Sequence, residues 1–248
     1  MGAVLAAPFG LVIGSFLNVV AYRLPLQKSI AFPASHCPSC ETPVKPYDNV
    51  PVVSWLLLRG RCRGCGERIS PRYPAVELLT AVAFTAIVLV NGANARLALE
   101  LPFAALLIAV SEIDLEHRII PNKLLLPAAA WGLAGGALLR TEHLQELVGA
   151  GAGAFTFLLI TALIHPKGMG MGDVKLAGVM GLYLGASIVP AMLIAFLSGS
   201  VVGAVMLARD GMAARKSGVP FGPFLALGGL VALLAGPDLI HLYTTHFL

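Results

Sequence analysis

The sequence predicts an all-α polytopic membrane protein with about eight transmembrane helices and one small polar insertion between the first two. The 248-residue chain is 57% hydrophobic and only 12% charged, with a mean hydropathy of +0.83, whereas soluble domains carry roughly a quarter charged residues. Its apolar runs are continuous rather than alternating, which indicates helices. Helices also satisfy their own backbone hydrogen bonds, as a segment in the water-free bilayer core must.

Eight segments have the length and apolar character of membrane-spanning helices: 2–22, 74–91, 97–113, 121–139, 145–164, 173–187, 188–208 and 221–241. The sixth and seventh form one apolar stretch that is divided only around Gly185 and Pro190. The first is expected to be a retained helix rather than a cleaved signal peptide, because its basic residue, Arg23, follows the apolar run. Its Gly10-x-x-x-Gly14 pair also allows another helix to approach closely.

The distribution of Lys and Arg predicts the orientation of these segments. Of the 17 basic residues, all but Arg96 and Arg140 lie in or beside the loops that follow segments one, three, five and seven. Cytoplasmic loops carry the excess of basic residues, so these loops are expected in the cytoplasm and both termini outside. The net charge of +4 follows from this bias, and no nucleic-acid partner is expected.

Three parts are expected: a first transmembrane helix (1–23), a cytoplasmic loop (24–73) and a seven-helix membrane core (74–248). The loop contains all four cysteines, as the pairs Cys37–Cys40 and Cys62–Cys65. Two CxxC pairs at this separation are typical of a four-thiolate zinc site. Two disulfides or four idle thiols are the alternatives, but the cytosol is reducing. Because four thiolates occupy all four coordination positions of a tetrahedral zinc ion, the zinc is expected to be structural.

Ionisable residues near a bilayer are candidates for function, and six acidic residues lie near a predicted cytoplasmic boundary: Glu77, Glu112, Asp114, Glu116, Asp173 and Asp210. Asp210 is interpreted as a helix-flanking residue. Glu112 and Glu116 share one helix face, where they are able to pair with Arg118 or Lys123. Asp114 lies about 200° around the helix from both, so it is expected to face the helix bundle.

Asp173 follows Gly168, Gly170 and Gly172 and begins an apolar run, so helix capping is a fair alternative to a functional role. Its predicted depth matches that of Asp114 on another helix. Two nearby carboxyl groups share one proton. The ionised one can take a proton from an attacking water, and the protonated one can give its proton to a leaving amine.

The chain resembles the bacterial type IV prepilin peptidases, which are bifunctional leader peptidases and N-methyltransferases of the GxGD aspartic class. The resemblance rests on the paired CxxC loop and on stretches that run nearly end to end: "GSFLNVVAYRLP" (14–25), "LLLRGRCRGCGERISPRYPAVELLT" (56–80), "DLEHRIIPN" (114–122), "GMGDVKLAG" (170–178) and "PFGPFLALG" (220–228). It implies a bacterial inner-membrane enzyme whose catalytic aspartates are Asp114 and Asp173, supported by Gly170, Gly172 and Lys175.

The resemblance also implies prepilins or pseudopilins as substrates, each with a short basic leader, a glycine and a long apolar helix. Glu112 and Glu116 are then candidates to attract the leader. The methyl donor would be S-adenosylmethionine, although the sequence has no glycine-rich Rossmann-type pattern. The resemblance places the methyltransferase determinants in the cysteine loop, which makes Gly60 and Arg61 candidates beside Glu77. A turn glycine and a positive-inside arginine are the alternative interpretations of the first two.

Three other functions fit parts of the sequence. A proton-coupled transporter also carries intramembrane carboxylates and glycine-broken helices, but no carboxylate lies at a predicted mid-membrane position. A non-catalytic scaffold stapled by zinc would explain the cysteines but not the two aspartates. The third alternative is a peptidase that lacks methyltransferase activity.

Overall fold

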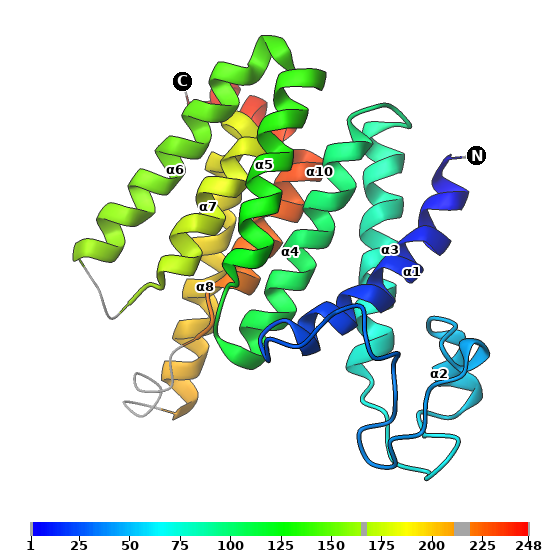
Figure 1. Cartoon of the computed structure of the whole chain (residues 1–248). Helices are drawn as coiled ribbons and strands as arrows, with labels where there is room; N and C mark the ends of the chain where they lie inside the picture. The colour runs from blue at the N-terminus through cyan, green and yellow to red at the C-terminus, as the bar shows by residue number, and fades with distance from the viewer. Residues whose placement is uncertain (1, 165–167, 211–218, 248) are drawn as a thin grey trace. The chain divides into compact units, whose positions relative to one another are not determined.

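The structure is a computed structural model that describes residues 2–164, 168–210 and 219–247, and these residues form helices and loops without a β-strand (Figure 1). The long helices are α1 (Gly2–Arg23), α3 (Arg72–Asn91), α4 (Leu97–His117), α5 (Asn122–Leu139), α6 (Leu144–Ile164), α7 (Met171–Leu184), α8 (Ile188–Asp210) and α10 (Gly222–Phe247). Short elements join them: η1 (Pro46–Asp48), α2 (Val53–Leu57), η2 (Thr141–His143) and η3 (Gly185–Ser187).

The predicted helical segments are confirmed, and their edges agree to within a few residues apart from the last segment, which extends to Phe247. The division of the long apolar stretch falls at Gly185, as predicted. This glycine has a φ of +56°, a left-handed conformation that residues with a Cβ rarely adopt. The helix therefore ends after Leu184, turns through η3 and restarts as α8.

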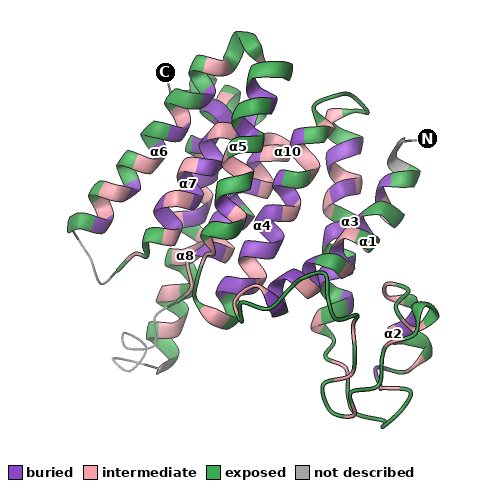
Figure 2. Ribbon diagram, in the orientation of Figure 1, coloured by how far each residue is buried: buried purple, intermediate pink, exposed green. Residues whose placement is uncertain are grey.

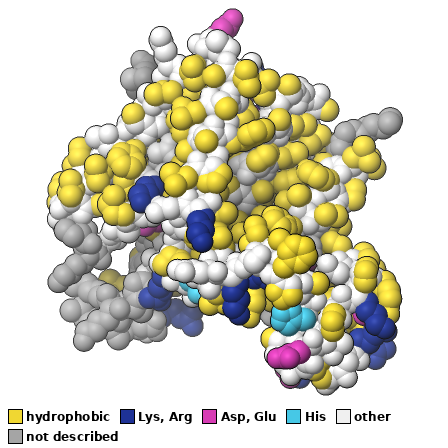
Figure 3. All heavy atoms as spheres, viewed as in Figure 1, with side chains coloured by type: hydrophobic (Ala, Val, Ile, Leu, Met, Phe, Trp, Pro, Cys, Tyr) yellow, Lys and Arg dark blue, Asp and Glu magenta, His cyan; other side chains and the backbone are white. Residues whose placement is uncertain are grey.

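Five stretches within the described residues are long and apolar enough to cross a membrane, and the longest, Met171–Arg209, joins α7 and α8. The helices α4 and α5 are not among them. Figure 3 shows hydrophobic side chains spread over the helical surface in view, with few charged side chains among them, as suits contact with lipid. The number of crossings and their sidedness remain predictions, and Lys167, Arg215 and Lys216 lie outside the described residues.

The chain packs as two units, Met1–Ala93 and Asn94–Leu248. In the first unit α1 lies against α3, and the predicted glycine pair makes the contact. A Cβ at Gly10 would lie 2.6 Å from the Cα of Ala81, and a Cβ at Gly14 would lie 2.6 Å from the Cα of Glu77. The α3 helix thus packs with α1, whereas the boundary expected after residue 73 remains a prediction.

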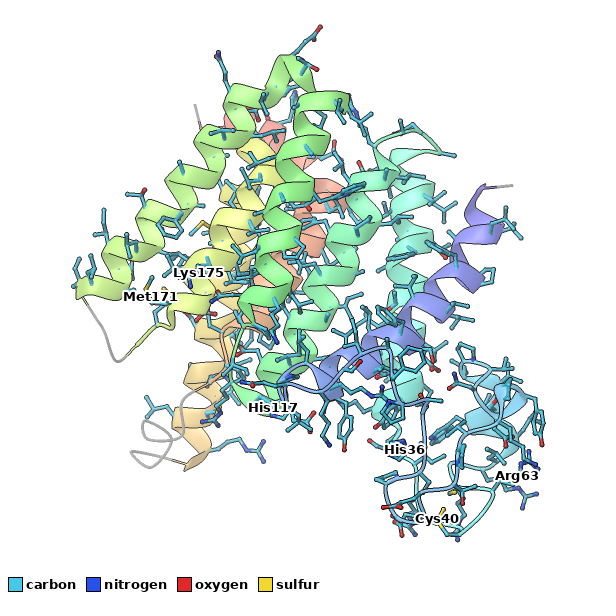
Figure 4. The ribbon with its side chains drawn as sticks, in the orientation of Figure 1. His36, Cys40, Arg63, His117, Met171 and Lys175 are labelled. Carbon is cyan, nitrogen blue, oxygen red and sulfur yellow. The ribbon has the colours of Figure 1, made fainter. Side chains whose placement is uncertain are left out.

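In the second unit α7 is the central helix, because it contacts α4, α5, α6, α8 and α10. Figure 2 shows the buried residues concentrated along α7 and α4. Phe103 of α4 stacks on Tyr183 of α7, with ring centroids 4.4 Å apart. Close contact with α6 depends on another glycine pair, since a Cβ at Gly181 would lie 2.5 Å from the Cα of Gly151. This packing fixes α7 beside α4, so that the C-terminal end of α4 and the N-terminal end of α7 share one end of the unit (Figure 4).

Candidate active site and metal centre

Asp114 lies in the last turn of α4 and is 5% exposed. The helix ends three residues later, and Arg118 adopts the left-handed conformation (φ 55°, ψ 40°) in which its N–H bonds to the Asp114 carbonyl at 2.9 Å. The Asp114 side chain turns inward, where its Oδ2 accepts the backbone N–H of Gly222 at 2.9 Å. Glu116 is exposed and Glu112 half-buried, which agrees with the prediction that Asp114 faces the bundle.

Asp173 lies in the first turn of α7 and is 9% exposed. Helix capping is the alternative role for this residue, but the cap position is Gly170, and Asp173 lies three residues further on. Its Oδ2 accepts the Gly170 N–H at 3.2 Å, so the carboxylate does satisfy one free donor of the helix start. Its other oxygen, Oδ1, is buried and has no hydrogen-bond partner among the residues that the structure describes.

The two carboxyl groups are near enough to act on each other electrostatically. Asp114 lies three residues before His117 at the end of α4, and Asp173 lies between Met171 and Lys175 at the start of α7; Figure 4 labels these three neighbours. Each carboxyl group accepts one backbone N–H, but only Asp173 has, among the described residues, a buried oxygen without a partner, so the two members of the pair are unequal. Two buried carboxyl groups in this arrangement can divide acid and base roles between them.

Two further contacts hold the segments that carry the aspartates. A Cβ at Gly172 would lie 2.9 Å from the Cβ of Ile120, so the glycine lets the start of α7 pack on the turn that follows α4. The Lys175 ammonium donates to Oδ1 of Asn122 at 3.1 Å and thereby joins α7 to the start of α5. Gly170 is the N-cap residue, and a Cβ there would lie 3.2 Å from Oδ2 of Asp173.

The four cysteines form one cluster in the loop, as their spacing predicts. All four sulfurs lie within 4.8 Å of one another, the Sγ atoms of Cys37 and Cys65 are 3.8 Å apart, and those of Cys40 and Cys62 are 3.9 Å apart. None of the four is in a disulfide. Four sulfurs bound to one tetrahedral zinc would be about 3.8 Å apart, given Zn–S bonds of about 2.3 Å. The cluster therefore fits a zinc ion.

The two CxxC segments have the same backbone hydrogen bonds. In the first, Cys37 N–H bonds to the Thr42 carbonyl at 3.0 Å and Glu41 N–H to the Cys37 carbonyl at 2.9 Å. In the second, Cys62 N–H bonds to the Glu67 carbonyl at 2.8 Å and Gly66 N–H to the Cys62 carbonyl at 2.9 Å. Each segment is thus a tight turn that presents two sulfurs on one side.

An ion pair joins the second turn to η1. Arg63 lies between Cys62 and Cys65, and its guanidinium donates to both oxygens of Asp48, at 2.6 and 2.9 Å. These bonds hold the pKa of Asp48 below its usual value, and Asp48 in turn raises the pKa of Arg63. The Arg63 guanidinium also lies over the Tyr47 ring, 5.6 Å from the centroid. Figure 4 shows Arg63 and Cys40 on the same loop.

Two of the methyltransferase candidates contact the segment that contains α2. Glu77 is 7% exposed, and its Oε2 accepts the Val52 N–H at 2.7 Å. Val52 has a φ of +61°, a strained conformation for a β-branched residue. Gly60 also has a positive φ, +65°, and a Cβ there would lie 2.9 Å from the Trp55 ring. The third candidate, Arg61, is exposed, and its backbone forms an isolated antiparallel β-bridge with Arg68.

Three groups at these sites were not predicted from the sequence. Asn122 was not assigned to Lys175, and the strained Val52 amide was not foreseen. The Gly222 N–H was missed as well, although "PFGPF" (220–224) does mark a helix start, because two prolines flank its glycine.

The comparisons define the class to which the protein belongs, the bacterial peptidases whose amino-terminal domain here contains the cysteine loop. Two family sequence models match the chain: the Bacterial Peptidase A24 N-terminal domain over residues 9–91 and the Type IV leader peptidase family over residues 101–208. The chain belongs to the type IV leader peptidase family.

Curated relatives match nearly the whole chain. A prepilin leader peptidase/N-methyltransferase of Aeromonas hydrophila is 36% identical over 97% of this chain and 93% of its own length. A protein of the same name from Bacillus subtilis is 37% identical over 95% of both chains. A type 4 prepilin-like proteins leader peptide-processing enzyme of Escherichia coli is 35% identical over 93% of both. No solved structure matches the chain.

Proposed function

We propose that the protein is a prepilin leader peptidase and N-methyltransferase of a bacterial inner membrane, with Asp114 and Asp173 as its catalytic pair. The observation that carries the proposal is the meeting of two buried carboxyl groups from α4 and α7 at one end of the second unit. The family and the names of the relatives support the same reaction. The substrates would be prepilins or pseudopilins, whose apolar helices lie in the bilayer.

Leader removal is a hydrolysis. One aspartate, as carboxylate, takes a proton from water while the water oxygen bonds to the scissile carbonyl carbon. The other, protonated, hydrogen-bonds the carbonyl oxygen and stabilises the charge that develops there. The C–N bond then breaks, and the amine nitrogen takes a proton from the acid. The leader leaves with a new carboxyl group, and the mature chain leaves with a free amine.

Methylation follows on that amine. The amine nitrogen would accept the methyl group of S-adenosylmethionine and give up a proton to water, and S-adenosylhomocysteine would leave. Gly60, Arg61 and Glu77 are the candidates to support this step, because they lie in or against the cysteine loop. Zinc held by Cys37, Cys40, Cys62 and Cys65 would supply structure to the loop rather than chemistry.

The orientation is part of the proposal. The cysteine loop, the end of α4 and the start of α7 would lie on the cytoplasmic side, which places the aspartates where a basic leader meets an apolar helix. Glu112 and Glu116, in the last turns of α4, would attract that leader through charge. A double charge reversal at these two positions is expected to raise the KM for a basic leader, whereas an unchanged KM would remove them from the site.

The experiment is intact-mass measurement of a prepilin after incubation with the purified protein and S-adenosylmethionine. Loss of the leader together with the gain of one methyl group is expected. Asp114→Asn and Asp173→Asn, which preserve shape, should each reduce cleavage at least about a hundredfold. A folded Asp173→Asn protein that cleaves at the normal rate would refute the mechanism. Cleavage without methylation by the unaltered protein would refute the second activity alone.

A further inference from the structure

We infer that the backbone N–H of Gly222 keeps Asp114 as the ionised member of the carboxyl pair. Asp114 is then the base that takes the proton from water, and Asp173 is the acid that gives its proton to the leaving amine. This inference rests on the proposed function, and it assigns two roles that the chemistry alone leaves interchangeable. Gly222 is a positioning residue, because it acts through Asp114.

The Gly222 N–H makes a well-formed hydrogen bond to the Asp114 carboxyl group. Gly222 is the first residue of α10, a helix of 26 residues. Its N–H donates to Oδ2 of Asp114 at 2.9 Å, although the two residues are 108 positions apart in the sequence. The first N–H groups of a helix have no partner within it, and the partial positive charge of a helix start favours an anion. A hydrogen bond to an ionised acceptor is about twice as strong as one between neutral groups.

Asp173 is the less favourable site for the negative charge. Its Oδ2 also accepts an N–H at a helix start, but at 3.2 Å. Among the described residues, no donor bonds to its buried Oδ1, and a buried oxygen without a donor is costly for an ionised carboxylate. A protonated carboxyl group tolerates this environment better, because one of its oxygens carries the proton and is itself a donor. The proton is therefore placed on Asp173.

The neighbouring charges are consistent with this division. Within the described residues, Asp173 from α7 and Arg118 at the end of α4 act electrostatically on Asp114. In α5, the charged residue closest to Asp114 in the sequence is Lys123. The charged and titratable residues of α10 begin at Asp238, which lies 16 positions after Gly222, so α10 presents a backbone N–H to Asp114.

A side chain at position 222 would disturb the same contact. An added Cβ would lie 2.7 Å from Oδ2 of Asp114 and 3.1 Å from its Cβ. Glycine is thus the residue that lets the start of α10 approach the carboxylate. Position 222 lies outside both segments that the family sequence models match, 9–91 and 101–208, so those matches do not assign it a role.

The test replaces the amide N–H at 222 with an ester oxygen, by incorporating glycolate in place of Gly222 in the full-length chain. This change removes the donor and adds no volume. The matched control is an ester at position 225, because the Leu225 N–H bonds to the Phe221 carbonyl at 3.1 Å in the same helix turn. Single-turnover cleavage of a prepilin is then measured against pH for all three proteins.

The pair loses its protons in two steps, and removal of the N–H raises the pH of the step that creates the charge on Asp114. We expect the pH of half-maximal cleavage on the acidic side of the pH–rate profile to rise by about one unit, which is a tenfold change in the acid dissociation constant. The half-point on the basic side should stay in place. The control ester should leave both half-points unchanged.

Two results would overturn the inference. A rise of the basic half-point alone would mean that Asp173 ionises first and that the roles are reversed. Unchanged half-points, or equal shifts in the control ester, would mean that the N–H does not select Asp114. Failure of the proposed function would look different, since the unaltered protein would not cleave or Asp114→Asn would still cleave.

Discussion

Removal of zinc is expected to unfold the cysteine loop and leave the second unit folded. Across residues 24–73 the buried residues are Ser54 and Gly60, so this loop has no buried apolar side chain of its own. Each fully buried large apolar side chain would contribute about 1.5–3 kcal/mol, and the loop lacks this contribution. Structural zinc contributes about 10–16 kcal/mol in zinc-finger peptides, which is as much as the whole stability of an ordinary domain, about 5–15 kcal/mol.

The assay is hydrogen exchange measured by mass spectrometry on Cys40→Ala and on chelator-treated protein. The amides of Cys37 and Cys62, which bond across their turns at 3.0 and 2.8 Å, should lose their protection. Peptides from α7 in the second unit serve as the internal reference. Leader cleavage should persist within a few-fold, while methylation falls with the loop.

Ser39→Ala is the matched control, because Ser39 is exposed and adjoins Cys40 in the same turn. It should retain zinc and exchange at the normal rate. If metal analysis shows that zinc has gone while the loop amides keep their protection, the loop has another source of stability and this reasoning is wrong.

Three further changes test the packing and the two chemistries. Gly14→Ala places a Cβ 2.6 Å from the Glu77 Cα and should lower the free energy of unfolding by about 1–3 kcal/mol, measured as a lower Tm. The control is Gly153→Ala, whose Cβ would meet nothing within 4 Å and should not lower the Tm. Glu77→Gln weakens the acceptor of the Val52 N–H and should slow methylation about tenfold, the difference between a charged and a neutral acceptor, with cleavage unchanged; equal losses in both would point to misfolding. Lys175→Met removes the bond to α5 and should reduce cleavage severalfold but not methylation of a pre-cleaved substrate, and a normal cleavage rate would exclude a supporting role.

Much of the fold could be predicted from the sequence, because lipid makes a simple demand on it. An apolar run must form a helix in the bilayer, so each run predicts a helix. The break between α7 and α8 was expected around Gly185 and Pro190, and the positive φ of Gly185 is its structural cause. The cysteine cluster was predictable for a similar reason. The CxxC spacing itself builds the turn that brings two sulfurs together.

The remaining features depend on contacts between distant backbone atoms. The Gly222 N–H reaches Asp114 across 108 residues, and no side-chain pattern encodes a donor that every residue except proline carries. The strained Val52 amide, held by Glu77 at 2.7 Å, is invisible in the same way. Valine favours extended backbone, so its local preference predicts the opposite of the conformation that it adopts.

The division of the chain at residues 93 and 94 has a consequence for how this protein can change over time. The first unit contains the cysteines and all three methyltransferase candidates, while the second contains both aspartates and Gly222. A substitution in one unit therefore alters none of the residues assigned to the proposed chemistry of the other. Recombination at this one junction would exchange the whole first unit, cysteine loop included, and would pass on every residue proposed for proteolysis.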